Sequence, residues 1–419
     1  MRLPGDKSIS HRALMLAALA NGPSRLTKLA SGSDVQATRR CLQQCGIMIT
    51  TGGEVTVVEG RGGAFDAPQA DLDCGNSGTT ARLLAGLLAG RGIAARITGD
   101  ASLSRRPMER ITVPLRQLGA NIAPAAGGTL PLDIRPVVLG SLDYTLPVPS
   151  AQVKSALLLA GLASEGIVTV REPVPTRDHT EIMLRALGID TGGPDDGVTV
   201  SSGRAALPAF DLQVPGDASS AAFLVALAVL VPGAVVSFEH LLLNPTRLGF
   251  YRTLQRMGGH VTWSAQGTEL GESVGQLSAQ SSGLRGIALA GDDIPAVIDE
   301  LPILAVLATQ AVGETVVRDA GELRYKESDR LTAICENIAR LGGEVERRPD
   351  GFRIQGPTPL TGAPIATYGD HRIAMAFAVA GHIASGDTIL DDPDCVEVSL
   401  PGFHELARAV TMGREAVES

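Results

Sequence analysis

The chain repeats one pattern six times, and this repeat constrains the fold more than any other feature of the sequence. Each copy has a small or polar opening, an apolar stretch of about three helical turns, a break that contains glycine and a β-branched stretch. The copies begin at Gly5, Gly75, Ser150, Gly216, Ile298 and Gly369, so successive copies start 66 to 82 residues apart. One unit cannot bury an apolar helix by itself, so the units are predicted to pack on one another with these helices inside.

A second helix is predicted in every unit, and each of these helices ends at a glycine. Glycine enters the left-handed conformation after a helix without a steric penalty. The six glycines are Gly46, Gly119, Gly188, Gly258, Gly342 and Gly413. An alternating strand pattern follows in the first five units. Each unit therefore reads as β, α, β, α, β, β in some cyclic order, and six units predict an α/β (α+β) protein of two similar domains.

Length and composition agree with a globular protein and exclude two classes. A chain of 419 residues with 44% hydrophobic and 19% charged residues is expected to form about two or three domains. The net charge of -9 excludes a general nucleic-acid surface, which needs a broad basic footprint. The longest apolar run, residues 221–231, ends at Pro232 and is too short to span a bilayer, so no membrane segment is expected.

The five cysteines are odd in number and scattered, which favours neither a disulfide framework nor a zinc site. No basic stretch followed by an apolar one opens the chain, so no signal peptide is expected. Both features fit a protein of the reducing cytoplasm.

The helix starts carry the unusual polar residues. A helix N-terminus offers unpaired N–H groups and a partial positive charge, so it favours anions. Several of these starts combine cations or hydroxyls with small or polar residues: Lys7, Ser8, Arg12, Asn76, Gly78, Thr79, Ser150, Gln152, Lys154, His371 and Arg372. The loops before the second helices add Arg106, Arg177, Lys326, Glu327 and Arg330. Asp299 and Glu300 add acidic groups. Each residue alone is more often a cap or a solvated side chain, but their recurrence in equivalent positions predicts a local site for a substrate with several negative groups.

Two familiar sites are rejected. The stretch "GDKS" lacks the earlier glycine and the preceding strand of a P-loop. The stretch "GNSGT" is not a G-x-S-x-G nucleophile elbow.

Nine ordered motifs resemble one enzyme family. They are "LPGDKSISHRALMLAALA", "GNSGTTARLLAGLL", "SLSRRPMERI", "PSAQVKSALLLAGL", "TRDHTEIML", "GDASSAAF", "IDELPILAV", "RYKESDRL" and "GDHRIAMAFAVAG". Together they resemble the 5-enolpyruvylshikimate-3-phosphate (EPSP) synthases from Pro4 to about Phe403. The resemblance implies two domains that close on the substrate, each of three βαβαββ units with parallel buried helices, an inside-out α/β barrel arrangement. The expected boundaries are residues 6–213 for the first domain, and residues 1–5 plus 214–419 for the second.

The same resemblance implies a transferase of the shikimate pathway of aromatic amino acid biosynthesis. It would move the enolpyruvyl group of phosphoenolpyruvate to the 5-hydroxyl of shikimate 3-phosphate and release phosphate. No metal and no organic cofactor is implied, and the partners are the two small-molecule substrates, with no nucleic acid and no membrane. A cytoplasmic monomer is the family expectation. The herbicide glyphosate would bind in the phosphoenolpyruvate pocket, where Gly78 leaves room for it.

The resemblance also assigns roles to residues. Shikimate 3-phosphate would be held mainly by the first domain, through Lys7, Ser8, Arg12, Ser150, the backbone at Ala151, Gln152, Thr176, Arg177, Asp299 and Lys326. Phosphoenolpyruvate would be held by Lys7, Asn76, Gly78, Thr79, Arg106, Gln152, Arg330 and Arg372. Glu327 would be the acid and base for the methylene group, and Asp299 would help to deprotonate the hydroxyl. Lys7 would stabilise the tetrahedral intermediate, assisted by His371.

Three positions depart from the family pattern. Ala151 stands where some relatives have a second serine, so only its backbone N–H can serve. Asp394 stands where some relatives have a phosphate-binding lysine. Only Met1, Arg2 and Leu3 precede the "PGDKS" turn, whereas relatives have a longer leader strand.

The sequence leaves two alternatives open. One is UDP-N-acetylglucosamine enolpyruvyl transferase, which shares the fold but opens with an Ala-Lys-Asn type motif and usually has a cysteine on a mobile loop. The other is a non-catalytic relative that only binds polyanions. The joint presence of Asp299, Lys326, Glu327, Arg330 and Arg372 argues against the second.

Overall fold

The computed structural model describes residues 1–192, 198–200 and 207–412. The chain divides into two compact units. The N-terminal unit comprises Gly5–Val214 and Thr268–Glu272, and the C-terminal unit comprises Met1–Pro4, Pro215–Gly267 and Ser273–Ser419.

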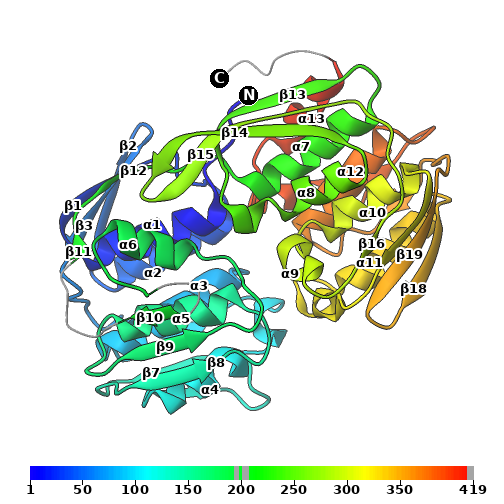
Figure 1. The fold of residues 1–419 in the computed structure, drawn as a ribbon. Coiled ribbons are helices and arrows are strands. Elements are labelled where there is room, and N and C mark those ends of the chain that lie inside the picture. Colours follow the sequence, from blue (N-terminus) through cyan, green and yellow to red (C-terminus); the bar gives the residue numbers. More distant parts are fainter. Residues whose placement is uncertain (193–197, 201–206, 413–419) are drawn as a thin grey trace. The chain divides into compact units, whose positions relative to one another are not determined.

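The N-terminal unit contains alternating helices and short strands (Figure 1). Its helices are α1 (Lys7–Leu19), α2 (Ser33–Gln44), α3 (Gly78–Arg91), α4 (Glu109–Gln117), α5 (Ala151–Gly161) and α6 (His179–Ala186), with a 3₁₀ turn, η1 (Leu103–Arg105). Its strands are β1 (Ala20–Thr27), β2 (Met48–Gly52), β3 (Val55–Arg61), β4 (Leu72–Asp73), β5 (Ala95–Thr98), β6 (Asn121–Pro124), β7 (Leu132–Arg135), β8 (Leu142–Thr145), β9 (Val168–Arg171), β10 (Val198–Val200), β11 (Leu207–Pro208) and β12 (Asp211–Gln213).

The C-terminal unit has the same alternation. Its helices are α7 (Ala218–Leu230), α8 (Gly249–Arg256), α9 (Asp293–Val297), α10 (Leu301–Gln310), α11 (Arg330–Arg340), α12 (His371–Gly381) and α13 (Phe403–Thr411), with the 3₁₀ turns η2 (Pro245–Arg247), η3 (Gly321–Tyr325) and η4 (Pro393–Val398). Its strands are β13 (Val235–Leu242), β14 (His260–Glu269), β15 (Glu272–Gln280), β16 (Ala288–Leu289), β17 (Gly313–Val317), β18 (Glu344–Arg348), β19 (Gly351–Gly356), β20 (Pro364–Ile365) and β21 (Ile389–Leu390).

The predicted βαβαββ unit is visible in complete form in both halves. In the N-terminal unit, β4, α3, β5, α4, β6 and β7 follow one another, and the strands pair in the order β4-β5-β7-β6. In the C-terminal unit, the sheet β16-β17-β19-β18 has the same order. In each sheet the first pair is parallel and the other two pairs are antiparallel. The mixed α/β class predicted from the repeat is therefore confirmed.

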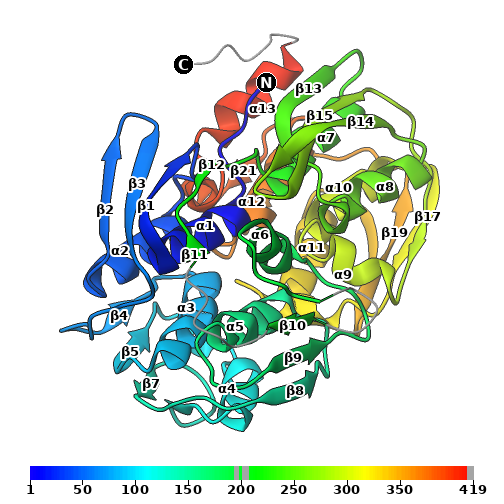
Figure 2. The same ribbon diagram turned by 60° about the vertical axis from the view of Figure 1, so that its left-hand side comes forward.

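The first helix of each repeat is buried, as its apolar composition predicts. Every residue of α7 from Ala218 to Val229 is buried, and α1, α3, α5, α10 and α12 are buried along nearly their whole length. In Figure 2 the sheets of the N-terminal unit lie around α1, α3 and α5. Each unit thus has helices inside and sheets outside, because the helices are apolar all round and the sheets have one polar face.

Two glycines bring α3 and α5 unusually close. A Cβ atom at Gly86 would lie 2.1 Å from the carbonyl oxygen of Ala156, and one at Gly90 would lie 2.6 Å from that of Ala160. Since no side chain fits in these gaps, the two backbones pack directly against each other.

The predicted glycine stops are found after the second helices. Gly46, Gly119, Gly188, Gly258 and Gly342 all have positive φ, between 82° and 105°. Gly413 lies outside the described residues.

The first four residues belong to the C-terminal unit. The amino group of Met1 donates a hydrogen bond to the carbonyl oxygen of Ser237 at 2.8 Å, and Glu239 N–H donates to the carbonyl oxygen of Met1 at 3.2 Å. In the N-terminal unit, β11 and β12 instead pair in parallel with β1. In each unit, a segment that is distant in sequence therefore hydrogen-bonds to a strand of a sheet.

All five cysteines are buried and free. In the part of the chain that the structure describes, no helix is both long and apolar enough to cross a membrane.

Candidate active site

The start of α1 brings two of the predicted cations into defined positions. Asp6 caps the helix by accepting a hydrogen bond from Ile9 N–H at 2.9 Å. Lys7 lies in the first turn, and its Nζ is 3.1 Å from Oδ2 of Asp34 at the start of α2. The side chain of Lys7 keeps 20% of its surface exposed, so its ammonium group is held but accessible.

Arg12 lies one turn further along α1 and is nearly buried. Its guanidinium donates to Oγ1 of Thr180 and Oγ of Ser155, each at 2.7 Å, and to the carbonyl oxygen of Ser8 at 3.0 Å. Burial lowers the pKa of Arg12 to about 10, Glu181 opposes the shift, and Arg177 adds to it. Arg12 and Arg177 thus act on each other electrostatically, which fits a site for an anion.

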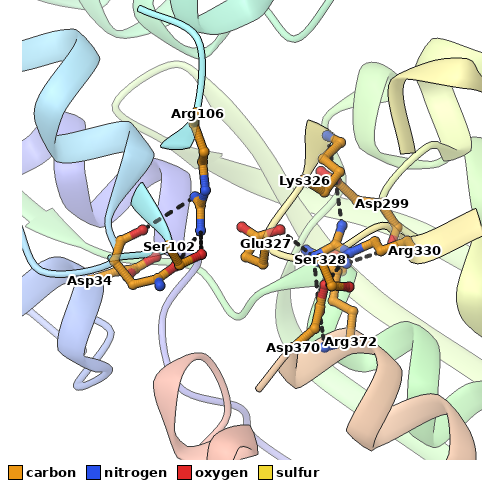
Figure 3. Close-up of polar contacts among 12 residues, drawn as sticks. Asp34, Ser102, Arg106, Asp299, Lys326, Glu327, Ser328, Arg330, Asp370 and Arg372 are labelled. Atoms are coloured by element: carbon orange, nitrogen blue, oxygen red, sulfur yellow. Dashed lines mark hydrogen bonds and ion pairs between the residues drawn. The ribbon is translucent and has the colours of Figure 1, made fainter. Parts of the chain in front are cut away.

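A second cluster of hydrogen-bonded polar residues lies at the start of α3. Ser77 caps this helix through a hydrogen bond from Thr80 N–H at 3.1 Å. Arg106 donates to the side-chain and backbone oxygens of Asn76 and to Oγ of Ser102, as Figure 3 shows in part. Asn76 in turn donates to Oδ2 of Asp100 at 2.7 Å. Two residues predicted for phosphoenolpyruvate, Asn76 and Arg106, are therefore in direct contact.

Gln152 connects α5 to α3. Its Nε2 donates to Oγ1 of Thr79 at 3.0 Å, and its Oε1 accepts from Nη1 of Arg82 at 2.7 Å. A Cβ atom at Gly78 would lie 2.8 Å from the same Arg82 nitrogen and 3.4 Å from Nη1 of Arg106. The helix start at Gly78 is therefore lined by two guanidinium groups.

At the start of α5, Ser150 is the N-cap residue. Its Oγ accepts a hydrogen bond from Val153 N–H at 3.4 Å, and its proton is not used in that bond. Ala151 follows as the first helical residue, and its N–H has no partner within the helix by position. Both groups can donate to an anion without disturbing the helix.

Lys154, also in the first turns of α5, does not belong to this anion site. The sequence groups it with the exposed cations, but its side chain is only 1% exposed and its Nζ lies 2.5 Å from Glu172 and 2.6 Å from Glu181. The two carboxylates neutralise it, so the prediction that it faces an anion is wrong. Glu172 also accepts a hydrogen bond from Oγ1 of Thr176. In this structure the hydroxyl of Thr176 is therefore hydrogen-bonded to the carboxylate of Glu172.

In the C-terminal unit, one cluster joins the predicted acid–base residues (Figure 3). Asp299 Oδ1 lies 3.0 Å from Nζ of Lys326 and 3.6 Å from Nη1 of Arg330. Glu327 Oε2 lies 2.6 Å from Nη2 of Arg330. The carboxylates of Asp299 and Glu327 therefore both lie beside Arg330, whose side chain is only 1% exposed, and Asp299 also pairs with Lys326.

Asp370 holds this cluster from the start of α12. It accepts from Nε and Nη2 of Arg330 at 2.8 and 3.1 Å, from Oγ of Ser328 at 3.0 Å, and from Arg372 N–H at 3.0 Å. Burial would lower the pKa of Arg330, but Asp370, Glu327 and Asp299 outweigh it and raise the pKa. Burial likewise opposes ionisation of Asp370, but Arg330 lowers its pKa. Arg330 and Asp370 are therefore both charged.

Two further predicted residues start α12. His371 is buried beside Asp370 and helps to lower the pKa of that carboxyl group. Arg372 Nη1 donates to Oγ of Ser219 at 2.7 Å and to the carbonyl oxygen of Asp299 at 2.9 Å, and it lies 3.4 Å from Oε1 of Glu300. Arg372 is thus joined to the Asp299 segment.

Asp394, the departure near the C-terminus, lies exposed in η4. Within residues 1–192, 198–200 and 207–412, no group of three or more His, Cys, Asp or Glu side chains is placed to hold a metal ion.

Sequence reasoning missed several polar residues of these clusters. Asp34, Arg82, Asp100 and Ser102 contact predicted residues in the N-terminal unit. Ser219 and Asp370 do so in the C-terminal unit, where Ser328 in turn donates to Asp370. Asp370 could have been found, because it stands directly before His371 and Arg372 and occupies a capping position. Arg82 gives no such signal, since an arginine inside a helix is usually solvated.

The fold resembles that of a known class of enzymes. The enolpyruvyl transferase NikO from Streptomyces tendae superposes with a TM-score of 0.75 at 21% identity, covering 98% of this chain and 94% of that one. At that identity the similarity establishes the fold, which is that of an enolpyruvyl transferase.

Closer similarity identifies the family. The model of the family described as EPSP synthase (3-phosphoshikimate 1-carboxyvinyltransferase) matches residues 1–406. A 3-phosphoshikimate 1-carboxyvinyltransferase of Thermus thermophilus is 48% identical over 408 residues, which cover 97% of this chain and 94% of the relative. An EPSP synthase from Acinetobacter baumannii has a TM-score of 0.86 at 40% identity, with 98% of this chain and 95% of that one covered. The chain belongs to the EPSP synthase family.

Proposed function

We propose that this chain transfers the enolpyruvyl group of phosphoenolpyruvate to the 5-hydroxyl group of shikimate 3-phosphate and releases phosphate, a step in aromatic amino acid biosynthesis. One observation carries the proposal beyond family membership. The carboxylates of Asp299 and Glu327 lie within 3.6 Å of the same buried guanidinium, that of Arg330. A pair of carboxylates among fixed cations suits proton transfer to and from an anionic substrate.

Shikimate 3-phosphate is assigned mainly to the N-terminal unit. Ser8 and Arg12 bind its carboxylate, and Ser150, the Ala151 N–H, Thr176 and Arg177 bind its 3-phosphate. Arginine suits both groups, since its planar fork binds carboxylate and phosphate through two parallel hydrogen bonds. Thr176 exchanges its hydrogen bond to Glu172 for one to the phosphate. Gln152 lies against the ring, and Lys7, Asp299 and Lys326 contact the ring hydroxyls.

Phosphoenolpyruvate is assigned to a second set of residues. The first group is Asn76, Gly78, Thr79, Arg106 and Gln152, together with Lys7, and the others are Arg330 and Arg372. The contacts of Arg106 with Asn76, and of Gln152 with Thr79, support a common role within the first group.

The reaction proceeds by addition and elimination. Glu327 gives a proton to the methylene carbon C3, so that C2 becomes electrophilic, and the 5-hydroxyl oxygen attacks C2 while its proton passes to Asp299. Lys7 stabilises the charge of the resulting tetrahedral intermediate, and His371 supports the same step. The bond from C2 to the phosphate oxygen then breaks, and phosphate leaves with the proton that Asp299 had accepted. C3 finally returns its proton to Glu327, so both carboxyl groups regain their starting states. Such positioned acid–base groups typically contribute about 10² to 10⁴ in rate.

The proposed reaction transfers no electrons between its substrates, and protonation activates the carbon that is attacked, so we propose it without a metal or organic cofactor. We also propose that the protein acts as a monomer in the cytoplasm.

Release of phosphate from phosphoenolpyruvate tests the proposal. The purified chain is assayed with shikimate 3-phosphate, with UDP-N-acetylglucosamine, or with neither acceptor. Release that depends on shikimate 3-phosphate is expected. Release only with the sugar nucleotide would show that UDP-N-acetylglucosamine is the acceptor. If neither acceptor leads to phosphate release, the chain is a polyanion-binding relative without this activity.

A further inference from the structure

The adjacent carboxylates Asp299 and Glu300 have different partners in the C-terminal unit. Asp299 lies beside Lys326 and Arg330 and is assigned to the chemistry above. Glu300 instead accepts a hydrogen bond from Oγ of Ser219 and lies 3.4 Å from Nη1 of Arg372. Neither Glu300 nor Ser219 takes part in the proposed steps of the reaction.

These contacts join three helix starts. Ser219 lies in the first turn of α7, Glu300 is the N-cap residue of α10, and Arg372 is the second residue of α12. All three side chains are nearly buried, with exposures of 4%, 5% and 9%. A buried carboxylate needs a cation and hydrogen-bond donors to remain charged, and Arg372, Ser219 and the positive helix ends supply them.

The contacts engage only one end of the Arg372 guanidinium. Nη1 donates to Ser219 and to the carbonyl oxygen of Asp299 and lies near Glu300. Nε and Nη2 make no hydrogen bond or ion pair with any residue in the described ranges. The guanidinium is therefore fixed in orientation, while the edge formed by Nε and Nη2 is left for a ligand.

We infer that Glu300 and Ser219 are positioning residues, which hold Arg372 so that its Nε–Nη2 edge binds an anionic group of phosphoenolpyruvate. The inference rests on the proposed function. A planar guanidinium binds a carboxylate or phosphate best through two parallel N–H groups, so a fixed orientation favours binding. Without Glu300, Arg372 would lose its carboxylate partner and could rotate about its side-chain bonds.

Steady-state kinetics of four variants test this role. Phosphate release is measured while phosphoenolpyruvate is varied at saturating shikimate 3-phosphate, and then with the two substrates exchanged. Glu300→Ala is expected to raise KM for phosphoenolpyruvate at least about tenfold, since a hydrogen bond to a charged group is lost. KM for shikimate 3-phosphate should change less than about twofold, because that substrate is assigned to other contacts.

The other variants separate charge, geometry and general stability. Glu300→Gln keeps an acceptor oxygen and should have a smaller effect than Glu300→Ala, and Ser219→Ala should raise the same KM about threefold or more. Glu344→Gln removes an exposed carboxylate of β18 and is the matched control, with no change expected. Thermal unfolding of each variant records stability beside the kinetics. If Glu300→Ala does not fold, Glu300→Gln and Ser219→Ala decide the question.

Two results would overturn the inference while leaving the proposed function intact. In one, the wild-type chain is active and KM for phosphoenolpyruvate stays within twofold in the folded variants. In the other, both KM values rise together as Tm falls, which indicates a structural role alone. A wild-type chain that releases no phosphate with shikimate 3-phosphate would overturn the proposed function and this inference together.

Discussion

Lys154 Nζ lies 2.6 Å from Oε1 of Glu181, and the two side chains are only 1% and 3% exposed. Glu172 lies at 2.5 Å from the same nitrogen. Burial would lower the pKa of Lys154, but Glu181 and Glu172 outweigh it and raise the pKa. The lysine is therefore a buried cation that compensates two carboxylates between α5, α6 and the end of β9.

Lys154→Met is predicted to destabilise the protein by about 3–5 kcal/mol, because it leaves the buried Glu181 and the partly buried Glu172 without their cation. The free energy of unfolding in urea, measured at pH 7.5, checks this value. Lys28→Met, which breaks an exposed pair with Glu54, is the matched control and should lose less than about 1 kcal/mol.

The double variant Lys154→Met/Glu181→Gln gives the second check. Removal of one carboxylate charge should restore part of the lost stability. A double variant that is less stable than Lys154→Met alone would show that uncompensated charge is not the cause.

His11 is predicted to make stability fall in acid. Its Nδ1 lies 2.7 Å from Oγ1 of Thr38 inside the N-terminal unit. Burial lowers the pKa of His11 from 6.5 to about 3, opposed by Asp34 and assisted by Lys7 and Arg12. Below pH 6.5 the unfolded chain binds a proton at this site and the folded chain does not, so its contribution to stability is lost as the pH falls towards 3.

The size of the effect follows from linkage. Between pH 6.5 and pH 5, this residue should remove about 2 kcal/mol from the free energy of unfolding. The check is to measure the wild type and His11→Gln at pH 7.5 and at pH 5.0. The difference between the two proteins should shrink by about that amount at pH 5.0. An equal difference at both pH values would contradict the prediction.

Lys7→Met is predicted to lower kcat by at least about 10², because a contact that stabilises charge in the transition state is lost. The protein should remain folded, since the side chain of Lys7 is 20% exposed and its pair with Asp34 is only partly buried. Phosphate release gives kcat and circular dichroism gives the fold. Near-normal turnover would show that Lys7 takes no part in the reaction.

Gly78→Ala is predicted to weaken phosphoenolpyruvate and glyphosate together. The new methyl group would lie 2.8 Å from Nη1 of Arg82 and 3.4 Å from Nη1 of Arg106, so these flexible tips must move. Glyphosate is expected to inhibit the wild type at millimolar concentration. Both KM for phosphoenolpyruvate and the inhibition constant of glyphosate should rise in the variant. Unchanged values for both ligands would show that neither binds at this helix start.

The buried helices could be predicted from the sequence because their signal is local. Ala221 to Val231 is apolar all round, and a helix of this kind has to be interior. The glycine stops are equally local, since a left-handed residue after a helix selects glycine whatever surrounds it.

The partners of the polar residues could not be predicted in the same way. In the sequence, Lys154 resembles an exposed cation at a helix start. Only the fold places Glu172, which follows β9, and Glu181 of α6 beside it. Arg372 meets Ser219, which is 153 residues away in the chain. Such contacts depend on how the repeats pack. The repeat pattern predicts that the helices pack together, but it does not predict which side chains contact each other.

The glycine contacts between α3 and α5 have a consequence for mutation. At Gly86 and Gly90 the two helices touch through main-chain atoms alone, so their separation cannot be adjusted by choosing a different rotamer. Any larger residue would wedge the helices apart and shift Gly78 relative to Ser150. A single methyl group at position 86, more than two turns from the helix start, would thus act as an active-site mutation although it alters no reactive group.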